Sequence, residues 1–290
     1  PNGISLLFLV LAWIALPATT ELHVFIVWIA GLAATLCILL LALPLAKSNT
    51  AKSGIDPPSV GSVFDLFRPG VVTMLSHLLY QTAWHGGVLY VGFVFSGPDV
   101  ALYAICLRLA ELVALPGVRV PFLGQPIVAA SDTARSHAYL SAAMQSLSTL
   151  ALIPSALFLA VFWFFGGFFL ETFFGAAYAH GALILFLVAL GRCIDIAAGS
   201  AAQSVLLIKG NRKAVLLVNA GTLLALMLLL PLFASRYALD GVGLALAIYF
   251  VLRSVLLAAV AMGLQGTATW PTFSIVKLRN GLNYRRDALD

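Results

Sequence analysis

Long apolar segments recur along the sequence, separated by short polar ones. They cover approximately residues 4–17, 22–45, 70–95, 99–118, 140–167, 181–208, 213–233 and 241–264. Apolar runs of about twenty residues can cross a hydrocarbon layer roughly 30 Å thick as α-helices. The segments are rich in Leu, Ala and Gly and lack the period-two alternation of membrane β-strands. The pattern therefore predicts an all-α, polytopic transmembrane helical bundle with about eight spans.

Polar segments divide this bundle into parts. Residues 1–46 hold two spans, 47–68 form the most polar linker, 69–265 form a six-helix lobe, and 266–290 form a polar tail. The linker ends with apolar residues at helical spacing, namely Val60, Val63, Phe64 and Phe67. Both a short interfacial helix and an ordinary loop fit this spacing.

Two helical hairpins resemble each other. The first helix of one ends at Leu16 and Pro17, and the first helix of the other ends at Leu230 and Pro231. Weak internal symmetry of this kind is typical of transporters built from repeated halves. The symmetry predicts a counterpart of residues 69–212, roughly 150 residues with four spans, upstream of Pro1.

Composition supports a membrane protein. The chain is 62% hydrophobic and 9% charged, with a mean hydropathy of +1.04, whereas soluble domains carry about 25% charged residues. Cys37, Cys106 and Cys193 fall inside apolar segments, which favours buried, inert thiols over disulfides or a zinc site.

Basic residues gather on one side of the predicted membrane. The loops and tail on that side carry Lys47, Lys52, Arg68, Arg119, Arg135, Lys209, Arg212, Lys213, Lys277, Arg279, Arg285 and Arg286. The opposite side carries Arg236 and several acids. By the positive-inside rule both termini of the chain are expected in the cytoplasm. The net charge of +5 is thus a topology signal beside anionic lipid, and no nucleic-acid partner is expected.

Catalytic motifs do not emerge from the sequence. It contains no phosphate-binding loop, nucleophile elbow or zinc-protease motif, and its polar loops are short. His77 and His85 would lie roughly 12 Å apart along one helix, too far to share an ion. We therefore expect no enzyme activity, no cofactor and no metal.

Five ionisable residues fall near the middle of predicted spans: Arg108, Glu111, Arg192, Asp195 and Arg253. Charge at this depth is costly unless it meets a partner or a wet cavity. Arg108 and Glu111 are three residues apart, as are Arg192 and Asp195, so each pair shares a helix face. The pairs could simply neutralise themselves and aid assembly, or could line a passage.

Two polar stripes extend this pattern. One joins Arg192 and Asp195 to Gly199 and Gln203, amid small residues that also suit close helix packing. The other, on the segment 70–95, repeats every four residues through Thr73, His77, Gln81 and His85. Lipid offers these groups no hydrogen-bond partner, so both stripes are expected to face inward. They could line a cavity or join packed helices.

Five motifs follow one another along the chain: FDLFRPGVVTMLSHLLYQ, PDVALYAICLRLAELVALP, LETFFGAAYAHGALILFLVALG, LLIKGNRKA and YALDGVGLALA. In their order and spacing they resemble bacterial polysaccharide flippases of the multidrug/oligosaccharidyl-lipid/polysaccharide exporter superfamily. Ala101 stands where family members often have Gly, two residues before the tyrosine. The resemblance implies two six-helix lobes around a central cavity, with this chain holding the end of the first lobe and all of the second.

The resemblance also implies a substrate, an oligosaccharide on polyprenyl pyrophosphate, carried across the bacterial inner membrane. Guanidinium groups suit phosphate oxygens, so Arg192, then Arg253 and Arg108, are the predicted anion-binding residues. His77, Gln81, His85 and Gln203 are predicted to bind sugars. Asp195 and Glu111 are candidates for proton or sodium coupling, although Asp195 could instead tune Arg192.

Two other functions fit the same residues. One is an ion-coupled multidrug exporter of the same superfamily, which predicts a cavity dominated by acids. The other is a non-transporting scaffold subunit of an envelope polysaccharide complex. A polysaccharide polymerase complex is an expected partner of a flippase as well.

Overall fold

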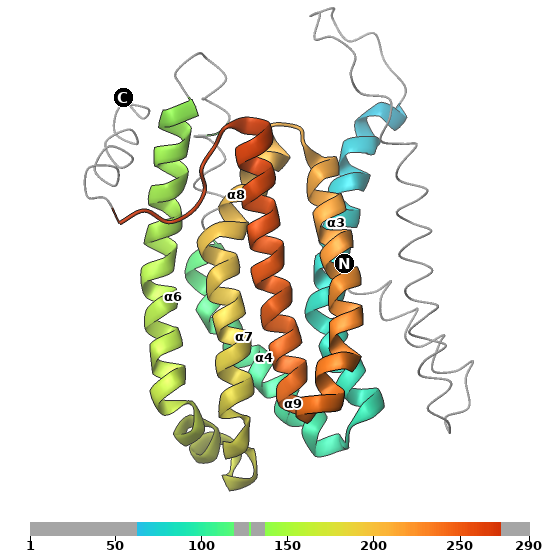
Figure 1. Ribbon diagram of the computed structural model, residues 1–290, viewed down its shortest axis with the longest axis vertical. Coiled ribbons are helices and arrows are strands. Elements are labelled where there is room, and N and C mark those ends of the chain that lie inside the picture. Colours follow the sequence, from blue (N-terminus) through green and yellow to red (C-terminus); the bar gives the residue numbers. More distant parts are fainter. Residues whose placement is uncertain (1–62, 119–127, 129–136, 274–290) are drawn as a thin grey trace, which may run out of the picture. The chain divides into compact units, whose positions relative to one another are not determined.

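The computed structural model describes residues 63–118, 128 and 137–273, which are helical apart from short connections (Figure 1). The helices in chain order are α3 (Val63–Val94), α4 (Gly97–Val118), α6 (His137–Phe174), η1 (Ala176–Gly181), α7 (Ala182–Ile194), η2 (Asp195–Gly199), α8 (Ser200–Ile208) and α9 (Arg212–Gln265). The described residues contain no strand. The predicted all-α class is therefore confirmed for this part of the chain.

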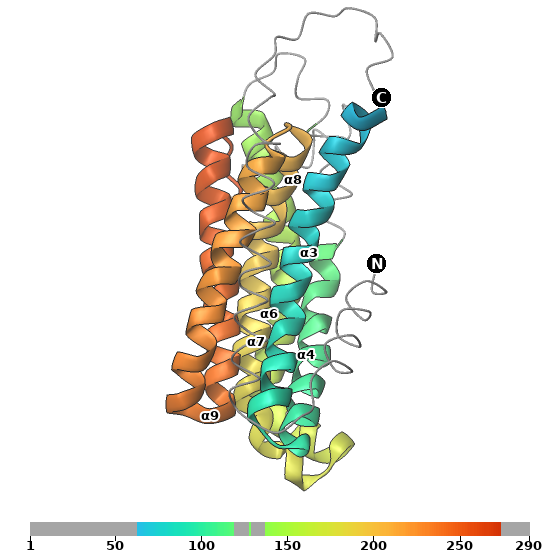
Figure 2. The ribbon, with the colours of Figure 1, turned by 90° about the vertical axis from the view of Figure 1, so that its right-hand side faces the viewer.

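Three described segments are long and apolar enough to cross a membrane: Leu140–Phe174, Ala176–Ile208 and Arg212–Gln265. The last segment folds back on itself, because Ala238 has a φ of 50° and a ψ of −132° inside α9. Its two legs lie side by side in both ribbon views (Figures 1 and 2). By the length and composition of its helices the chain is a helical membrane protein. The total of about eight spans stays a prediction.

The expected boundaries agree well with those helices that the structure describes. α3, α4 and α6 contain the expected spans 70–95, 99–118 and 140–167 almost completely. The spans expected at 4–17 and 22–45 lie outside the described residues. α3 begins at Val63, so the last turns of the predicted linker belong to α3 and form no separate interfacial helix. Residues 47–62 of the linker lie outside the described part.

The rod formed by α7, η2 and α8 is the centre of the described bundle. α7 contacts α4, α6 and α9, and Leu185, Val188 and Ala189 are fully buried in it. A Cβ on Gly191 would lie 2.9 Å from the Cα of Ala247, so only glycine allows this approach of α7 to α9. The close packing through small residues that the sequence suggested is present here.

The outer face of α6 is strongly apolar. Trp163, Phe164 and Phe168 are 59%, 74% and 69% exposed. Contiguous exposed apolar surface of this kind is rare on soluble proteins and is covered by lipid or protein partners where it occurs. Position Pro154 lies inside α6 without ending it. Nearby, the Ser155 hydroxyl donates to the carbonyl oxygens of Val113 and Ala151, each at 2.8 Å, which ties α6 to α4.

The first residues of the expected tail form a strap along α6. Gly266, with a φ of 58°, ends α9 in the left-handed conformation that favours glycine. Ser148 Oγ then donates to the carbonyl oxygen of Thr269 at 2.9 Å. Thr149 Oγ1 donates to the carbonyl oxygen of Thr272 and accepts from its N–H, both at 2.9 Å. Residues 266–273, the start of the predicted tail, thus pack against α6. Residues 274–290 lie outside the described part.

Candidate functional site

Asp195 occupies the middle of the described bundle and holds two arginines. It is the first residue of η2, a π-helical turn between α7 and α8, and is 3% exposed. One carboxylate oxygen accepts from Arg192 Nη1 at 3.2 Å, and the other accepts from Arg253 Nη1 on α9. Ser254 and Tyr80 donate to the same carboxylate, each at 3.3 Å. The contact between Arg192 and Asp195 that their spacing predicted is therefore formed.

Arg253 is buried, and each of its three side-chain nitrogens donates a hydrogen bond. It is 2% exposed, and besides Asp195 it donates through Nε to Asn219 Oδ1 at 2.9 Å. Its Nη2 donates to Gln203 Oε1. Each of these acceptors belongs to the same lobe, so Arg253 serves to join the α7–α8 rod to both legs of α9.

Asn219 extends the network to α3 and was missed by the sequence analysis. Its Nδ2 donates to the carbonyl oxygen and the hydroxyl of Ser76, at 3.0 and 2.8 Å. It is fully buried. The sequence does mark this residue, because it is the one asparagine inside the apolar run VLLVNAGTLLALMLLL. A side-chain amide in the middle of a membrane needs hydrogen-bond partners from other helices.

Aromatic rings enclose Arg192. The Arg192 Cζ atom lies 4.9, 5.2 and 5.9 Å from the ring centroids of Trp84, Phe250 and Tyr80, within the range of cation–π attraction. Arg192 Nη1 also donates to the hydroxyl of Tyr80. Its side chain is 13% exposed, and its buried Nε has no hydrogen-bond partner among the described residues.

The buried cluster carries excess positive charge. It combines the guanidinium groups of Arg192 and Arg253 with the single carboxylate of Asp195, while the remaining hydrogen-bond acceptors are neutral oxygens. Arginine stays protonated in proteins, even in a low dielectric. The centre of the described lobe therefore has a net charge of about one positive unit.

A π-helical turn shapes this cluster. Gly199 closes η2, and a Cβ there would lie 2.5 Å from Asp195 Oδ1 and 2.9 Å from Ser254 Oγ. The glycine thus leaves the space that Asp195 needs to reach Arg253. π-Helical turns inside α-helices are found frequently at functional sites.

A second polar group lies on the surface of α3 and α4. Arg108 Nη1 and Glu111 Oε1 are 3.2 Å apart, and the two side chains are 71% and 39% exposed. Trp84 Nε1 donates to Glu111 Oε1 at 3.1 Å, and His85 lies within electrostatic range of both charges. The predicted pair is formed, and it faces outward from the described lobe.

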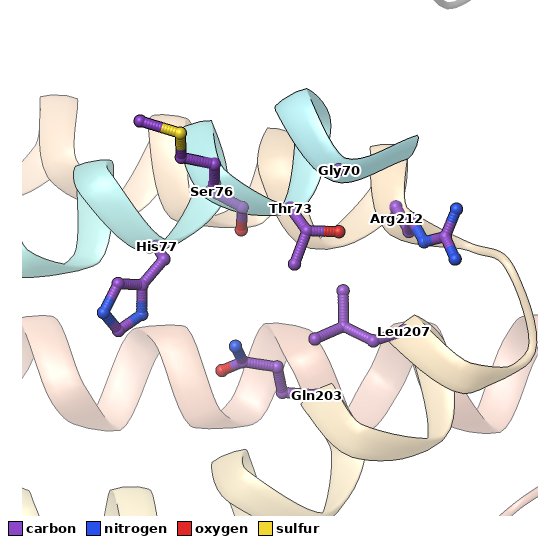
Figure 3. A pocket seen from close by; sticks show the side chains of 8 residues that line it. Gly70, Thr73, Ser76, His77, Gln203, Leu207 and Arg212 are labelled. Carbon is purple, nitrogen blue, oxygen red and sulfur yellow. The ribbon is translucent and has the colours of Figure 1, made fainter. Parts of the chain in front are cut away.

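The second polar stripe that the sequence predicted lies on α3 and is largely accessible. His77 and His85 are exposed, and Gln81 is partly so. Gln81 Nε2 lies 3.2 Å from His77 Nε2. Gln203 and His77 also line a cavity of about 520 Å³ between α3 and the junction of α8 with α9 (Figure 3). The stripe is thus on the lobe surface, whereas the buried stripe around Asp195 lies inside it.

The structure separates the predicted site residues into two groups. Arg192, Asp195, Arg253 and Gln203 form one connected network in the interior. Arg108, Glu111, His77, Gln81 and His85 lie on the accessible side of α3 and α4. Arg253, one of the predicted anion-binding residues, is 2% exposed, and each of its three side-chain nitrogens donates to a protein group in this arrangement.

No family model matches the chain, and neither a curated protein nor a solved structure shows significant similarity to it.

Proposed function

We propose that the chain forms part of a bacterial inner-membrane flippase that moves an oligosaccharide on polyprenyl pyrophosphate by alternating access. The observation that supports this proposal is the exposed polar surface of α3 and α4. Arg108 lies 11 residues after Gly97, the first residue of α4, which is about 17 Å along the helix axis. A charged side chain at that depth needs water or protein beside it, because lipid cannot solvate it.

In this proposal Arg108 is the first cation that the pyrophosphate meets. Its guanidinium is accessible, and its partner Glu111 also bonds to Trp84, so a phosphate oxygen can replace one of the carboxylate contacts. His77, Gln81 and His85 on the same side of the lobe offer hydrogen bonds to sugar hydroxyls. Both termini of the chain would lie in the cytoplasm, as the basic loops indicate.

Arg192 and Arg253 have a different part in the proposal. They act through the field of the interior cluster, whose net positive charge lowers the cost of an anion beside α3. Asp195 keeps both arginines in place; its two oxygens already accept from four donors. This occupancy favours a positioning role over ion coupling for Asp195, whereas Glu111, whose side chain is 39% exposed, remains the candidate for ion coupling.

Complementation tests the function. The complete reading frame would be expressed in a host that lacks its own flippase and is supplied with a matched lipid-linked substrate, and surface polysaccharide would be measured. We expect export from the intact protein. We expect Arg108→Gln to reduce export about tenfold or more, since a charge-assisted hydrogen bond contributes about 1.5–3 kcal/mol.

Arg236→Gln is the matched control, because Arg236 is also exposed but lies near the reversal at Ala238. Its export should equal that of the wild type. Undiminished export by Arg108→Gln would remove Arg108 from the site. Absence of export from the wild type at normal membrane levels would remove the function and favour the scaffold alternative.

A further inference from the structure

The cavity between α3 and the α8–α9 junction has no role in the proposed function beyond one of its lining residues, His77. Its volume is about 520 Å³, within the range of pockets that hold small ligands. Its walls include Thr73, Ser76, His77, Gln203, Arg212 and Met74 (Figure 3). Thr73 and Arg212 lie toward one end and His77 toward the other (Figure 3).

The lining has the chemistry of an anion site. None of the lining residues that the structure describes is an acid, and Arg212 supplies a permanent cation. Arg212 is also the first residue of α9, where the helix dipole favours negative charge.

The inner wall of the cavity is held in place by the buried network. Ser76 accepts from Asn219 through both its hydroxyl and its carbonyl oxygen. Gln203 accepts from Arg253 through its amide oxygen, so its NH2 group is the part that can donate to a ligand. Because Arg253 lies directly behind Gln203, the excess charge of the cluster adds to the field in the cavity.

An apolar surface adjoins the cavity. Val71, Met74 and Leu78 follow one face of α3 at intervals of three and four residues, and are 53%, 64% and 38% exposed. A phosphate with attached acyl chains would use this surface, whereas free phosphate would not. Cationic pockets between membrane helices beside such surfaces suit lipid headgroups.

We propose that this cavity binds the phosphate of an anionic phospholipid, with Arg212 as its cation and the acyl chains lying along Val71, Met74 and Leu78. Thr73, His77 and Gln203 provide further hydrogen-bonding groups around the phosphate. The site is separate from the exposed Arg108 and does not depend on the proposed transport function. Its ligand is a lipid that stays with the protein, not the transported molecule.

Native mass spectrometry of the intact, detergent-purified chain tests this site. Phosphatidylglycerol and phosphatidylethanolamine would be titrated separately onto the wild type, Arg212→Gln and Lys213→Gln. We expect the wild type to prefer phosphatidylglycerol, and Arg212→Gln to bind it about tenfold more weakly or worse. Lys213→Gln removes the same charge from the adjacent residue, which does not line the cavity, and should bind as the wild type does.

Two further measurements keep the outcome decisive. Gly70→Leu should also abolish the preference for phosphatidylglycerol, because Gly70 lines the cavity and a leucine side chain there would occupy the space of the ligand. A Cβ at Gly70 meets no atom within 4 Å, so this variant should fold, and it provides the test if Arg212→Gln folds poorly. Millimolar inorganic phosphate should not displace the lipid. If Arg212→Gln and Lys213→Gln lose the same affinity for phosphatidylglycerol, the lipid binds to general surface charge and the proposed site is wrong. If inorganic phosphate displaces the lipid, the ligand of the cavity is a phosphate ion and not a phospholipid.

Discussion

Two ion pairs with the same sequence spacing have opposite environments in this protein. Arg192 and Asp195 are buried among aromatic rings and a second arginine, whereas Arg108 and Glu111 are exposed. Exposed ion pairs contribute about 0–1 kcal/mol to stability. Removing one partner of a buried pair costs about 3–5 kcal/mol, because an uncompensated charge remains.

This contrast predicts unequal effects of isosteric substitutions. Asp195→Asn should destabilise the protein strongly, by roughly 3–5 kcal/mol, since two buried guanidinium groups would lose their only carboxylate among the described residues. Glu111→Gln should change stability by about 1 kcal/mol or less. Thermal unfolding of both variants in one detergent would measure the difference. Similar melting temperatures for the two variants would contradict the buried network.

At the scale of the helices, spacing predicted much of what the structure shows. The apolar segments gave the extents of α3, α4 and α6 closely, because length and hydropathy determine where a helix can be membrane-embedded. The spacing of Arg192 and Asp195 likewise predicted their contact. Periodicity did not reveal which buried polar residues bond to each other across the bundle. The contact of Arg253 with Asn219, for example, joins the two legs of α9, and spacing along one helix cannot predict it.

The π-helical turn was not predicted from the sequence. An α-helical wheel places Arg192 and Gln203 on nearly the same face, and in the structure both lie toward α3. Arg192 lies against Trp84, and Gln203 lines the cavity together with Ser76 and His77. The wider turn η2 between them holds more residues than an α-helical turn, and nothing in the pattern of apolar positions marks such a turn.

The hydrogen bonds between α6 and the strap of residues 266–273 can be tested by one substitution. Thr149→Val removes both hydrogen bonds to Thr272 while keeping the shape of the side chain. We expect faster amide hydrogen exchange at Thr272 and its neighbours, by about tenfold for each 1.4 kcal/mol lost. Thr82→Val is the control, because Thr82 Oγ1 donates within its own helix, to the carbonyl oxygen of Leu78 at 2.9 Å. Unchanged exchange in Thr149→Val would show that the strap is held by other contacts.

The whole described lobe has two kinds of accessible surface. The α6 surface presents Trp163, Phe164 and Leu157, whereas α3 and α4 present His85 and Arg108. A membrane can cover the first kind directly. The second kind requires water or another part of a protein, which is why the proposed function places a passage there.

Cysteine labelling in intact cells distinguishes the two surfaces. In a cysteine-free background, His85→Cys should react readily with a charged, water-soluble maleimide. Leu157→Cys should not react, although Leu157 is 67% exposed, because lipid would exclude the reagent. Both should react after denaturation, which checks expression. Equal protection of both positions in the folded protein would mean that the α3 surface is covered and not wet.

The wide turn at Asp195–Gly199 also limits which residues can replace its last glycine. A methyl group at Gly199 would lie 2.5 Å from Asp195 Oδ1 and 2.9 Å from Ser254 Oγ. Even alanine would therefore force the carboxylate or the hydroxyl out of its place. The absence of a single methyl group is thus what lets two arginines share one acid inside the lobe.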